Sequence, residues 1–123
     1  MAANKVLRFG PAALANSAAN IINTNITSLS GPVGYTQTQP YVIIKHIRIV
    51  NKTASAATCS LYVGATGASA AGTEFLGTAL SIAANSAYDW YGLLRLDAAD
   101  FLTGLASAAT TLTFEAEGEI GLV

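Results

Sequence analysis

The stretch that most constrains the fold runs from Tyr41 to Gly64 and has the sequence YVIIKHIRIVNKTASAATCSLYVG. Its first ten residues are rich in β-branched and aromatic side chains, which favour extended structure. Residues 58–63 alternate between polar and apolar side chains, a period typical of a strand with one buried face. Residues 51–57, between them, are turn formers and small residues. The stretch therefore predicts two strands joined in a hairpin.

The hairpin implies a register between its two strands. Closure near Ala54 would place Ile49 opposite Cys59 and Ile47 opposite Leu61. Because side chains alternate along a strand, the register then predicts one shared apolar face. The residues expected on this face are Ile43, Ile47, Ile49, Cys59, Leu61 and Val63.

The same alternation predicts on which face each polar residue of the first strand lies. His46 would project to the other face, beside Tyr62. Lys45 and Arg48 would lie on opposite faces of an otherwise apolar strand. One of the two must then reach solvent with an extended stem or pair with a partner protein, and the sequence leaves both alternatives open.

The rest of the chain consists of short strand-type segments separated by turn formers. Gly10-Pro11 is expected to end the first of them, and the alanine-rich residues 12–19 could form one or two helical turns. Asp97 and Asp100 are expected to cap a turn through their side chains. The further candidate strands are 5–9, 20–28, 74–82, 87–96, 101–105 and 111–117.

Two of these segments predict which side chains share a face. In the aromatic segment, Tyr88 and Trp90 fall on one face, and Asp89 and Tyr91 on the other. In the last segment the two faces differ in the same way, with an apolar side formed by Leu112, Phe114 and Ala116 and a polar side formed by Thr111, Thr113, Glu115 and Glu117.

Turn signals recur every eight to twelve residues, and no segment has the pattern of an amphipathic helix. This combination predicts an all-β fold, an antiparallel β-sandwich or jelly-roll-like domain of about eight short strands. At 123 residues the chain is expected to form one domain. Residues 1–40 are expected to be a partly extended N-terminal arm or added strands of that domain.

The low charge content favours some classes of function and argues against others. Charged residues make up 11% of the chain, against about 25% in a typical domain, which favours a protein that lies against other protein surfaces. A compact domain with a neutral polar surface is the alternative. The net charge of −1 and the six scattered basic residues argue against nucleic-acid binding. No segment is apolar enough for a signal peptide or a membrane span.

No combination of residues predicts an enzyme, a cofactor or a metal site. Cys59 and His46 are the one cysteine and the one histidine, but the expected register keeps them apart, and a catalytic thiol needs a base within reach. Glu115, Glu117 and Glu119 form an acidic row without the shaped oxygen cage that calcium requires. Asp89 could supply paired carboxylates with Asp97 and Asp100, although capping already explains the last two.

The aromatic residues have two interpretations. Tyr35, Tyr41, Tyr88, Trp90 and Tyr91 could line a sugar site, or Trp90 could be core and the tyrosines anchors of a protein interface. The second interpretation is preferred, and the residues predicted to contact a partner are Tyr35, Tyr41, Lys45, Arg48, Tyr88 and Tyr91. The glycosylation sequons at Asn25 and Asn51 are interpreted as chance matches.

The segments IIKHIRIVNKTASAATCSLYVG and FLGTALSIAANSAYDWYGLLRLDAADFLTGLASAATTLTFEAEG carry a resemblance. Their order of short words, from about Ile43 to Gly118, resembles small β-sandwich structural proteins of tailed bacteriophages. In that family a strand I-x-I-x-N-x-T/S precedes x-L-x-V-G, a D-W strand, L-x-L-x-A-x-D-x-L and a final L-T-F strand. The matching positions are Asn51, Gly64, Asp89, Trp90, Leu96, Asp100, Leu102 and Leu112.

The resemblance implies a function. Such proteins are capsid decoration (cement) proteins or components associated with the tail or fibre. A decoration protein would bind the major capsid protein, commonly as a homotrimer, and would reside on the capsid surface of the virion after synthesis in the host cytoplasm. A tail or fibre component would instead recognise a host-surface glycan. Residues 1–40 depart from the family pattern and are expected to anchor the protein, so that their deletion would abolish binding and leave a folded core.

Overall fold

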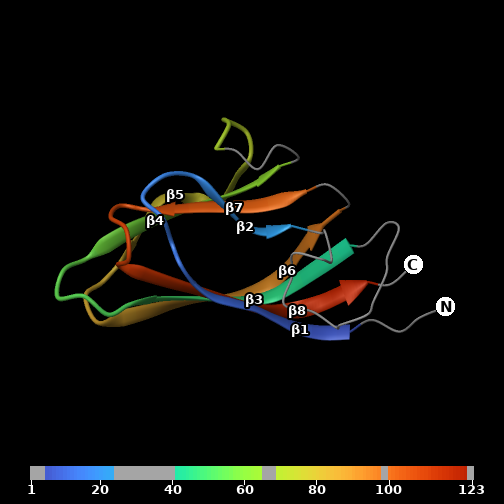
Figure 1. Cartoon of the computed structure of the whole chain (residues 1–123), viewed down its shortest axis with the longest axis horizontal. Coiled ribbons are helices and arrows are strands. Elements are labelled where there is room, and N and C mark those ends of the chain that lie inside the picture. The colour runs from blue at the N-terminus through green and yellow to red at the C-terminus, as the bar shows by residue number, and fades with distance from the viewer. Residues whose placement is uncertain (1–4, 24–40, 65–68, 98–99, 122–123) are drawn as a thin grey trace.

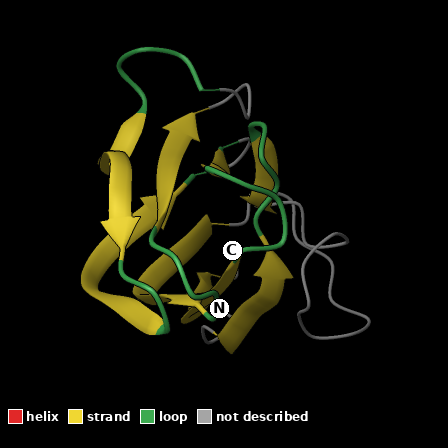
Figure 2. Cartoon of the chain, turned by 90° about the vertical axis from the view of Figure 1, so that its left-hand side faces the viewer, coloured by secondary structure: helices red, strands yellow, loops and turns green. Residues whose placement is uncertain are grey.

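The computed structural model describes residues 5–23, 41–64, 69–97 and 100–121. In this part of the chain all regular structure is β-strand (Figure 2), which confirms the predicted all-β fold. The eight strands are β1 (Lys5–Ala13), β2 (Ala19–Asn23), β3 (Tyr41–Asn51), β4 (Ala57–Gly64), β5 (Glu74–Ile82), β6 (Ser86–Leu96), β7 (Phe101–Ala106) and β8 (Leu112–Gly121).

The strands form two antiparallel sheets that lie face to face (Figure 1). The first sheet has the order β1-β8-β3-β6, and the second has the order β2-β7-β4-β5. Only β4 and β5 are neighbours both in the chain and in a sheet, because every other connection between the described strands crosses from one sheet to the other. This order is the topology of an eight-stranded jelly roll.

The predicted pairing of β3 with β4 is wrong. β3 pairs with β6 and β8 in the first sheet, whereas β4 pairs with β5 and β7 in the second. The segment between them crosses from one sheet to the other, and no hairpin forms. Ile47, Ile49, Cys59 and Leu61 nevertheless all face the interior, since two facing sheets bury the same alternating positions as one shared face would.

A bulge in β3 displaces the predicted alternation. Between Ile44 and His46 the register shifts against both neighbouring strands. Ile44 and Ile47 are therefore both buried, with one more residue between them than a regular strand allows. Ile43, which was predicted to face the core, is only partly buried.

The same bulge overturns the prediction for Lys45, whereas His46 lies on the predicted face with a different neighbour. Lys45 and Arg48 do not lie on opposite faces, because both side chains are about half exposed on the outer side of the first sheet. His46 lies on that side too, against Tyr91 of β6, and not beside Tyr62. The insertion of one residue thus gathers three polar side chains on one surface.

The core between the sheets is made of the inward residues of both. Phe114, Ile44, Ile47, Ile49, Leu61, Leu96, Leu102, Leu112 and Ile120 are among its fully buried side chains. The predicted apolar side of the last strand is confirmed. The rings of Trp90 on β6 and Phe75 on β5 pack edge to face, with their centroids 5.1 Å apart. This aromatic pair connects the two sheets.

The N-terminal strands are integral to both sheets. β1 continues past Gly10-Pro11 to Ala13, with a register shift between Phe9 and Ala12, so these two residues do not end the strand. The expected helical turns at residues 12–19 are absent. Leu14 N–H donates to Leu112 O at 3.0 Å, and Ala15 O accepts from Ala106 N–H at 2.8 Å, so the segment after β1 spans both sheets.

The position of β1 and β2 in the two sheets affects the prediction that residues 1–40 are an anchor that can be deleted. Phe9, Leu14 and Ile22 belong to the buried core, so residues 5–23 hold the sandwich together, whereas residues 24–40 lie outside the described part of the chain. Deletion of the whole segment 1–40 would remove three core side chains and two strands. The prediction that such a deletion leaves a folded core conflicts with this packing.

The side chain of Asn51, at the end of β3, connects the crossover segment between β3 and β4 to the second sheet by hydrogen bonds. Its side-chain amide donates to Ser55 O at 2.9 Å and to Ile82 O at 3.0 Å. Its Oδ1 accepts from both the amide and the hydroxyl of Thr53, at 2.9 and 2.7 Å. All polar atoms of this fully buried side chain are used, which explains the N-x-T word and leaves no room for a glycan.

Candidate binding surface on the outer face of the first sheet

Charge is distributed very unequally between the two sheets. Of the six basic and seven acidic residues of the chain, the strands of the second sheet hold only Glu74. Three more lie in loops, and all the others lie in the strands of the first sheet. These nine are Lys5, Arg8, Lys45, Arg48, Asp89, Arg95, Glu115, Glu117 and Glu119. We call the outer side of this sheet the charged face.

His46 is the centre of a polar cluster on the charged face. Its Nε2 lies 2.8 Å from Asp89 Oδ1, and its Nδ1 lies 3.5 Å from Glu117 Oε1. The same Asp89 oxygen lies 3.6 Å from Arg48 Nε. Three neighbouring strands supply these groups, because His46 and Arg48 on β3 lie between Asp89 on β6 and Glu117 on β8.

An aromatic ring continues this cluster toward the edge strand. Tyr91 of β6 stacks on the His46 imidazole with ring centroids 4.6 Å apart and 14° between the planes. The stack covers one face of the Tyr91 ring, and Tyr91 is still 73% exposed. The other face of this ring is therefore offered to solvent.

A guanidinium on the charged face also contacts a tyrosine ring. The Arg95 guanidinium lies 4.3 Å from the centroid of the Tyr41 ring, a cation–π geometry. Arg95 Nε also donates to Asp97 Oδ1 at 2.6 Å, and this hydrogen bond raises the pKa of the guanidinium. The Tyr41 ring packs over Gly121, where no side chain stands in its way.

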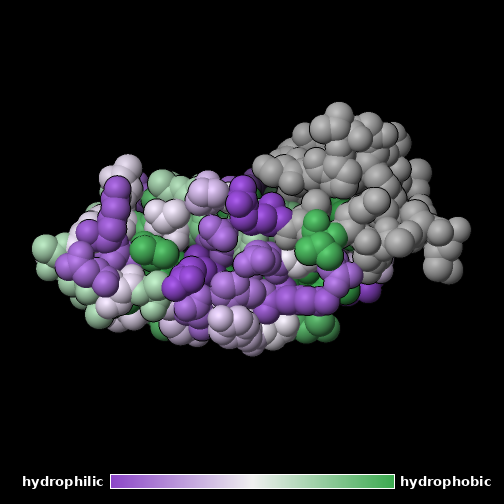
Figure 3. Space-filling model, turned by 90° about the horizontal axis from the view of Figure 1, so that it is seen from below, coloured by the Kyte–Doolittle hydropathy of each residue, from purple (hydrophilic) through white to green (hydrophobic). Residues whose placement is uncertain are grey.

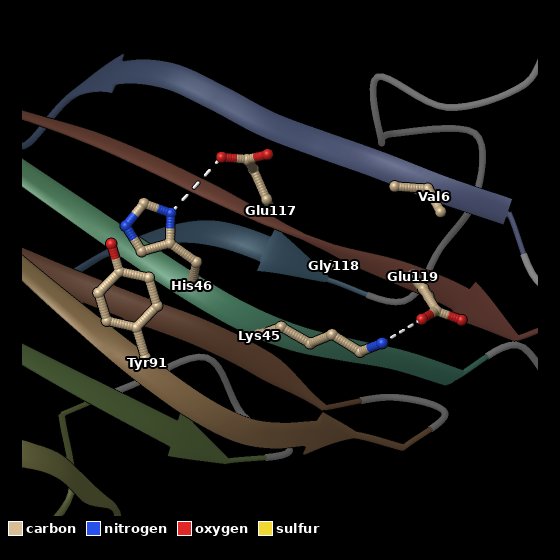
Figure 4. Close-up of a pocket in the computed structure, with 7 residues that line it drawn as sticks. All are labelled: Val6, Lys45, His46, Tyr91, Glu117, Gly118 and Glu119. Carbon is tan, nitrogen blue, oxygen red and sulfur yellow. Dashed lines mark hydrogen bonds and ion pairs between the residues drawn. The ribbon is translucent and has the colours of Figure 1, made fainter.

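A pocket of about 540 Å³ lies on the charged face. Lys45 and Glu119 form an ion pair at one end of it, and His46 with Tyr91 and Glu117 forms the other (Figure 4). The bulge at Lys45 turns adjacent residues of β3 toward both ends. The lining residues are Val6, Lys45, His46, Tyr91, Glu117, Gly118 and Glu119.

Exposed apolar side chains accompany the charges. Within the described residues, the large apolar side chains with the greatest exposure are Val6, Tyr91 and Leu93, at 80%, 73% and 70%, and Val50 is also exposed. All four belong to strands of the first sheet. Figure 3, which views this face from outside, shows hydrophilic side chains across it with separate apolar spots among them. Such a mixture is typical of a protein-binding surface.

The structure brings together four of the six residues predicted to contact a partner. Tyr41, Lys45, Arg48 and Tyr91 lie on the charged face. Tyr88 is turned inward and packs against the core. It shares this face with Trp90, as the alternation along β6 predicted. Tyr35 lies outside the described residues.

The candidate catalytic groups are separated. Cys59 of the second sheet faces the core at 1% exposure, where burial raises the pKa of its thiol to about 11, and His46 lies on the outer side of the first sheet. Asp97 N–H donates to Asp100 Oδ2 at 2.9 Å, which confirms the predicted capping of this turn. Among residues 5–23, 41–64, 69–97 and 100–121, no three His, Cys, Asp or Glu side chains are grouped to hold a metal ion.

The chain matches no protein-family model, no curated protein and no solved structure. In the described part of the chain there is no helix long and apolar enough to span a membrane.

The cluster around His46 could not be predicted from the sequence, because it depends on the pairing of β3 with β6 and β8. The bulge that brings Lys45 to the same face has no local signal in β3 either. One indirect sign lies on the neighbouring strand. A Cβ atom at Gly118 would lie 2.0 Å from Ile43 O, so the close approach of β3 to β8 beside the bulge requires a glycine. A glycine inside a strand is a known sign of such an approach.

Proposed function

We propose that this chain is a non-enzymatic structural protein of a phage virion, a decoration (cement) protein that binds the assembled head shell. In this proposal the charged face contacts the major capsid protein, on the outer surface of the capsid. The observation that carries the proposal is the concentration of charges and exposed apolar side chains on this one face.

The energetics of binding fit this surface. Protein interfaces combine a few exposed aromatic and aliphatic anchors with charged groups that fix the partner's orientation. Tyr91 and Leu93 supply such anchors, and the ion pairs around Asp89 supply the charges. A protein that binds only the assembled shell stabilises that shell by mass action.

The fold and the sequence words also support the proposal. Jelly rolls occur in viral capsid proteins and in lectins, although a fold alone does not determine function. The short words from Ile43 to Gly118 resemble those of phage virion proteins, and Asn51 within them has a structural role in the crossover. A homotrimer completes the proposal, because decoration of a symmetric shell favours a cyclic assembly.

The test is cosedimentation of the purified protein with heads that lack it, followed by a heat challenge. We expect saturable binding and a higher rupture temperature of the decorated heads. Light scattering after size exclusion would measure the mass of the free protein, with three copies expected. A well-folded protein that does not bind heads would overturn the proposal.

Leu93→Ser tests whether the charged face makes the contact. Leu93 is exposed and does not line the pocket, so its loss removes apolar contact area while the pocket stays intact. We expect head binding to weaken about fivefold or more. Ser81→Ala, an exposed position on β5 of the second sheet, is the matched control and should bind like the parent. Equal effects of both variants would contradict the placement of the contact.

Recognition of a host-surface glycan by a tail or fibre component is the second candidate function. The observation that favours it is the Tyr91 ring, which offers one open face beside carboxylates, since sugar rings stack on aromatic faces and their hydroxyl groups donate to carboxylates. Binding of the purified protein to host cells or glycans, without binding to heads, would favour this function.

A further inference from the structure

The first sheet ends in a long edge strand that is open to pairing. β6 is the last strand in the order β1-β8-β3-β6, so among the described strands only β3 borders it. The open side of an edge strand presents a row of backbone N–H and C=O groups that can pair with another strand. We propose that β6 pairs antiparallel with β6 of a second copy of this chain, about a two-fold axis at Gly92.

The first support is a comparison with the other three edge strands of the sandwich, each of which has a feature that opposes pairing. β1 contains Pro11, which has no N–H group to donate. β2 has five residues. β5 contains Leu76 and Ala79, whose φ values of 67° and 53° depart from strand geometry. β6 runs for 11 residues without a proline or a positive φ, so it is the edge best suited to extend a sheet.

The second support is the regular alternation of side chains along β6. The strand packs Tyr88, Trp90, Leu94 and Leu96 against the core. The side chains on the charged face are, in chain order, Asp89, Tyr91, Leu93 and Arg95. The outer row of β6 therefore consists of an anion, two exposed apolar side chains and a cation.

This outer row is complementary to itself. In an antiparallel pair centred on Gly92, residues equally far from Gly92 lie opposite each other. Asp89 of one copy is then opposite Arg95 of the other, and Tyr91 is opposite Leu93. Opposite charges and apolar pairs directly across two strands both stabilise a sheet. The two-fold axis forms each of these contacts twice.

Other registers of the same strand lack this match. A pairing centred on Tyr91 would place Asp89 opposite Leu93, and one centred on Leu93 would place Asp89 opposite Asp97. A centre between two residues would place outer side chains opposite inner ones. Of these registers, the one about Gly92 is the one that opposes unlike charges.

Both charged side chains have atoms that remain available for the second copy. Asp89 contacts His46 and Arg48 through Oδ1, so its Oδ2 can accept from a further donor. Arg95 donates to Asp97 from Nε, and its side chain is 55% exposed. The two terminal NH₂ groups of the guanidinium supply the donors for the carboxylate of the other copy.

This contact goes beyond the proposed function and does not rest on it. A two-fold axis that opposes outer side chains to outer side chains is perpendicular to the sheet, so the charged faces of both copies point to the same side. A trimer would present three β6 edges. The pairing would then connect trimers to each other and is compatible with a three-fold assembly.

The test is disulfide crosslinking of the full chain with two single variants, Tyr91→Cys and Leu93→Cys. In the proposed register, position 91 of one copy lies opposite position 93 of the other, with Cα atoms about 4.5–5.5 Å apart, within the range of a disulfide. Two copies of the same variant would carry their cysteines on a diagonal, about 7–8 Å apart, which is too far. The register can therefore be read from which variants crosslink.

We expect a mixture of the two variants to form a covalent dimer under mild oxidation, as seen on a non-reducing gel. Each variant alone should remain uncrosslinked. The parent is the background control, because its Cys59 is buried. A mixture that does not crosslink, or that crosslinks no better than each variant alone, would overturn the inference.

Arg95→Glu tests the charge complementarity. It places a carboxylate opposite Asp89 of the other copy, twice in each pair, so self-association measured by sedimentation equilibrium should weaken about tenfold or more. The matched control is Arg8→Glu, the same change at an exposed position on β1, the opposite edge of the sheet, which should associate like the parent. Equal effects of the two variants would contradict the register.

Measurements on the free protein separate this inference from the proposed function. If the mixture crosslinks and the parent binds no heads, the pairing of β6 stands and the decoration function is wrong. If the parent binds heads and the mixture does not crosslink, the decoration function stands and the pairing is wrong. An assembly larger than three copies that falls to three copies with Arg95→Glu would support both the pairing and the trimer.

Discussion

The two sheets of this sandwich share one core and differ in their outer sides. The strands of the first sheet carry nine charged residues, and those of the second carry Glu74 alone. On the outer side of the second sheet, Ser60, Tyr62 and Thr103 are buried or nearly so. On the charged face, Tyr91 and Arg48 are exposed. The inner sides, in contrast, are mostly apolar, and Asn51 at the end of β3 is a buried polar side chain there.

This difference indicates where stability and binding are located. Surface ion pairs contribute little to stability, about 0–1 kcal/mol each, so the charges of the first sheet do not explain why the protein folds. The proposed function assigns these charges to contact with another protein. Buried groups of the core and of the crossovers are expected to carry the stability, and substitutions can separate the two roles.

The largest expected effect on stability is that of Gly118→Ala, which places a methyl group against the backbone beside the bulge in β3. The new Cβ would lie 2.0 Å from Ile43 O, a backbone atom that cannot move without parting β3 from β8. We expect a loss of at least about 3 kcal/mol of unfolding free energy, the upper range for overpacking. Urea unfolding followed by circular dichroism would measure it.

Gly64→Ala in the second sheet is the matched control. There the new Cβ would meet only the Thr73 methyl group, at 3.2 Å, and that side chain can give way. We expect a loss below about 1 kcal/mol. If the two variants lose equal stability, the bulge in the first sheet is not the constraint that the geometry indicates.

The bulge also marks the limit of what the sequence could predict. The strand segments, the all-β fold and the faces of β6 and β8 follow from alternation, because burial in a sandwich has a period of two. The pairing of β3 with β4 was predicted wrongly, since β3 and β4, like all consecutive described strands except β4 and β5, lie in different sheets. One extra residue at Lys45 then reversed the predicted faces of Ile43 and Lys45.

Asn51→Ala tests the connection between the two sheets. The variant would lose the hydrogen bonds to Ser55 O and Ile82 O and leave the Thr53 amide without its acceptor. Because these groups are buried or partly buried, we expect a loss of about 2–3 kcal/mol. Thermal unfolding would show it as a lower Tm.

The control for Asn51→Ala is Asn85→Gly in the turn that faces the same crossover. Asn85 is exposed and has a φ of 54°, which glycine adopts without strain. Its N–H group still donates to Thr53 O in the variant. A Tm within a few degrees of the parent is expected. A large fall would mean that the turn, and not the Asn51 side chain, joins the sheets.

The second sheet should lose stability at alkaline pH through Cys59. Burial raises the pKa of this thiol from 9.0 to about 11, so the folded state holds its proton more tightly than the unfolded state. The contribution is fully present below pH 9 and is lost as pH rises from 9 to 11. At pH 10.5 the loss is roughly 2 kcal/mol.

Cys59→Ala removes this titration, so the difference in urea stability between the parent and the variant should shrink between pH 8 and pH 10.5. The same burial predicts that a thiol reagent will label the folded parent only after unfolding at pH 8. Rapid labelling of the folded protein would show that Cys59 is accessible and that the second sheet is less closed than its burial indicates.

The smallest effect on stability is expected from Lys45→Met on the charged face. The variant removes the ion pair with Glu119 and keeps most of the apolar stem that lies along the sheet. Because the ammonium group is about half exposed, the unfolding free energy should change by less than about 0.5 kcal/mol. Head binding should change measurably, since the substitution removes a positive charge from the edge of the pocket. The comparison of the two sheets requires that this substitution change binding and leave stability almost unchanged. A variant that loses stability and keeps binding would mean that the charges of the first sheet hold the fold and not a partner.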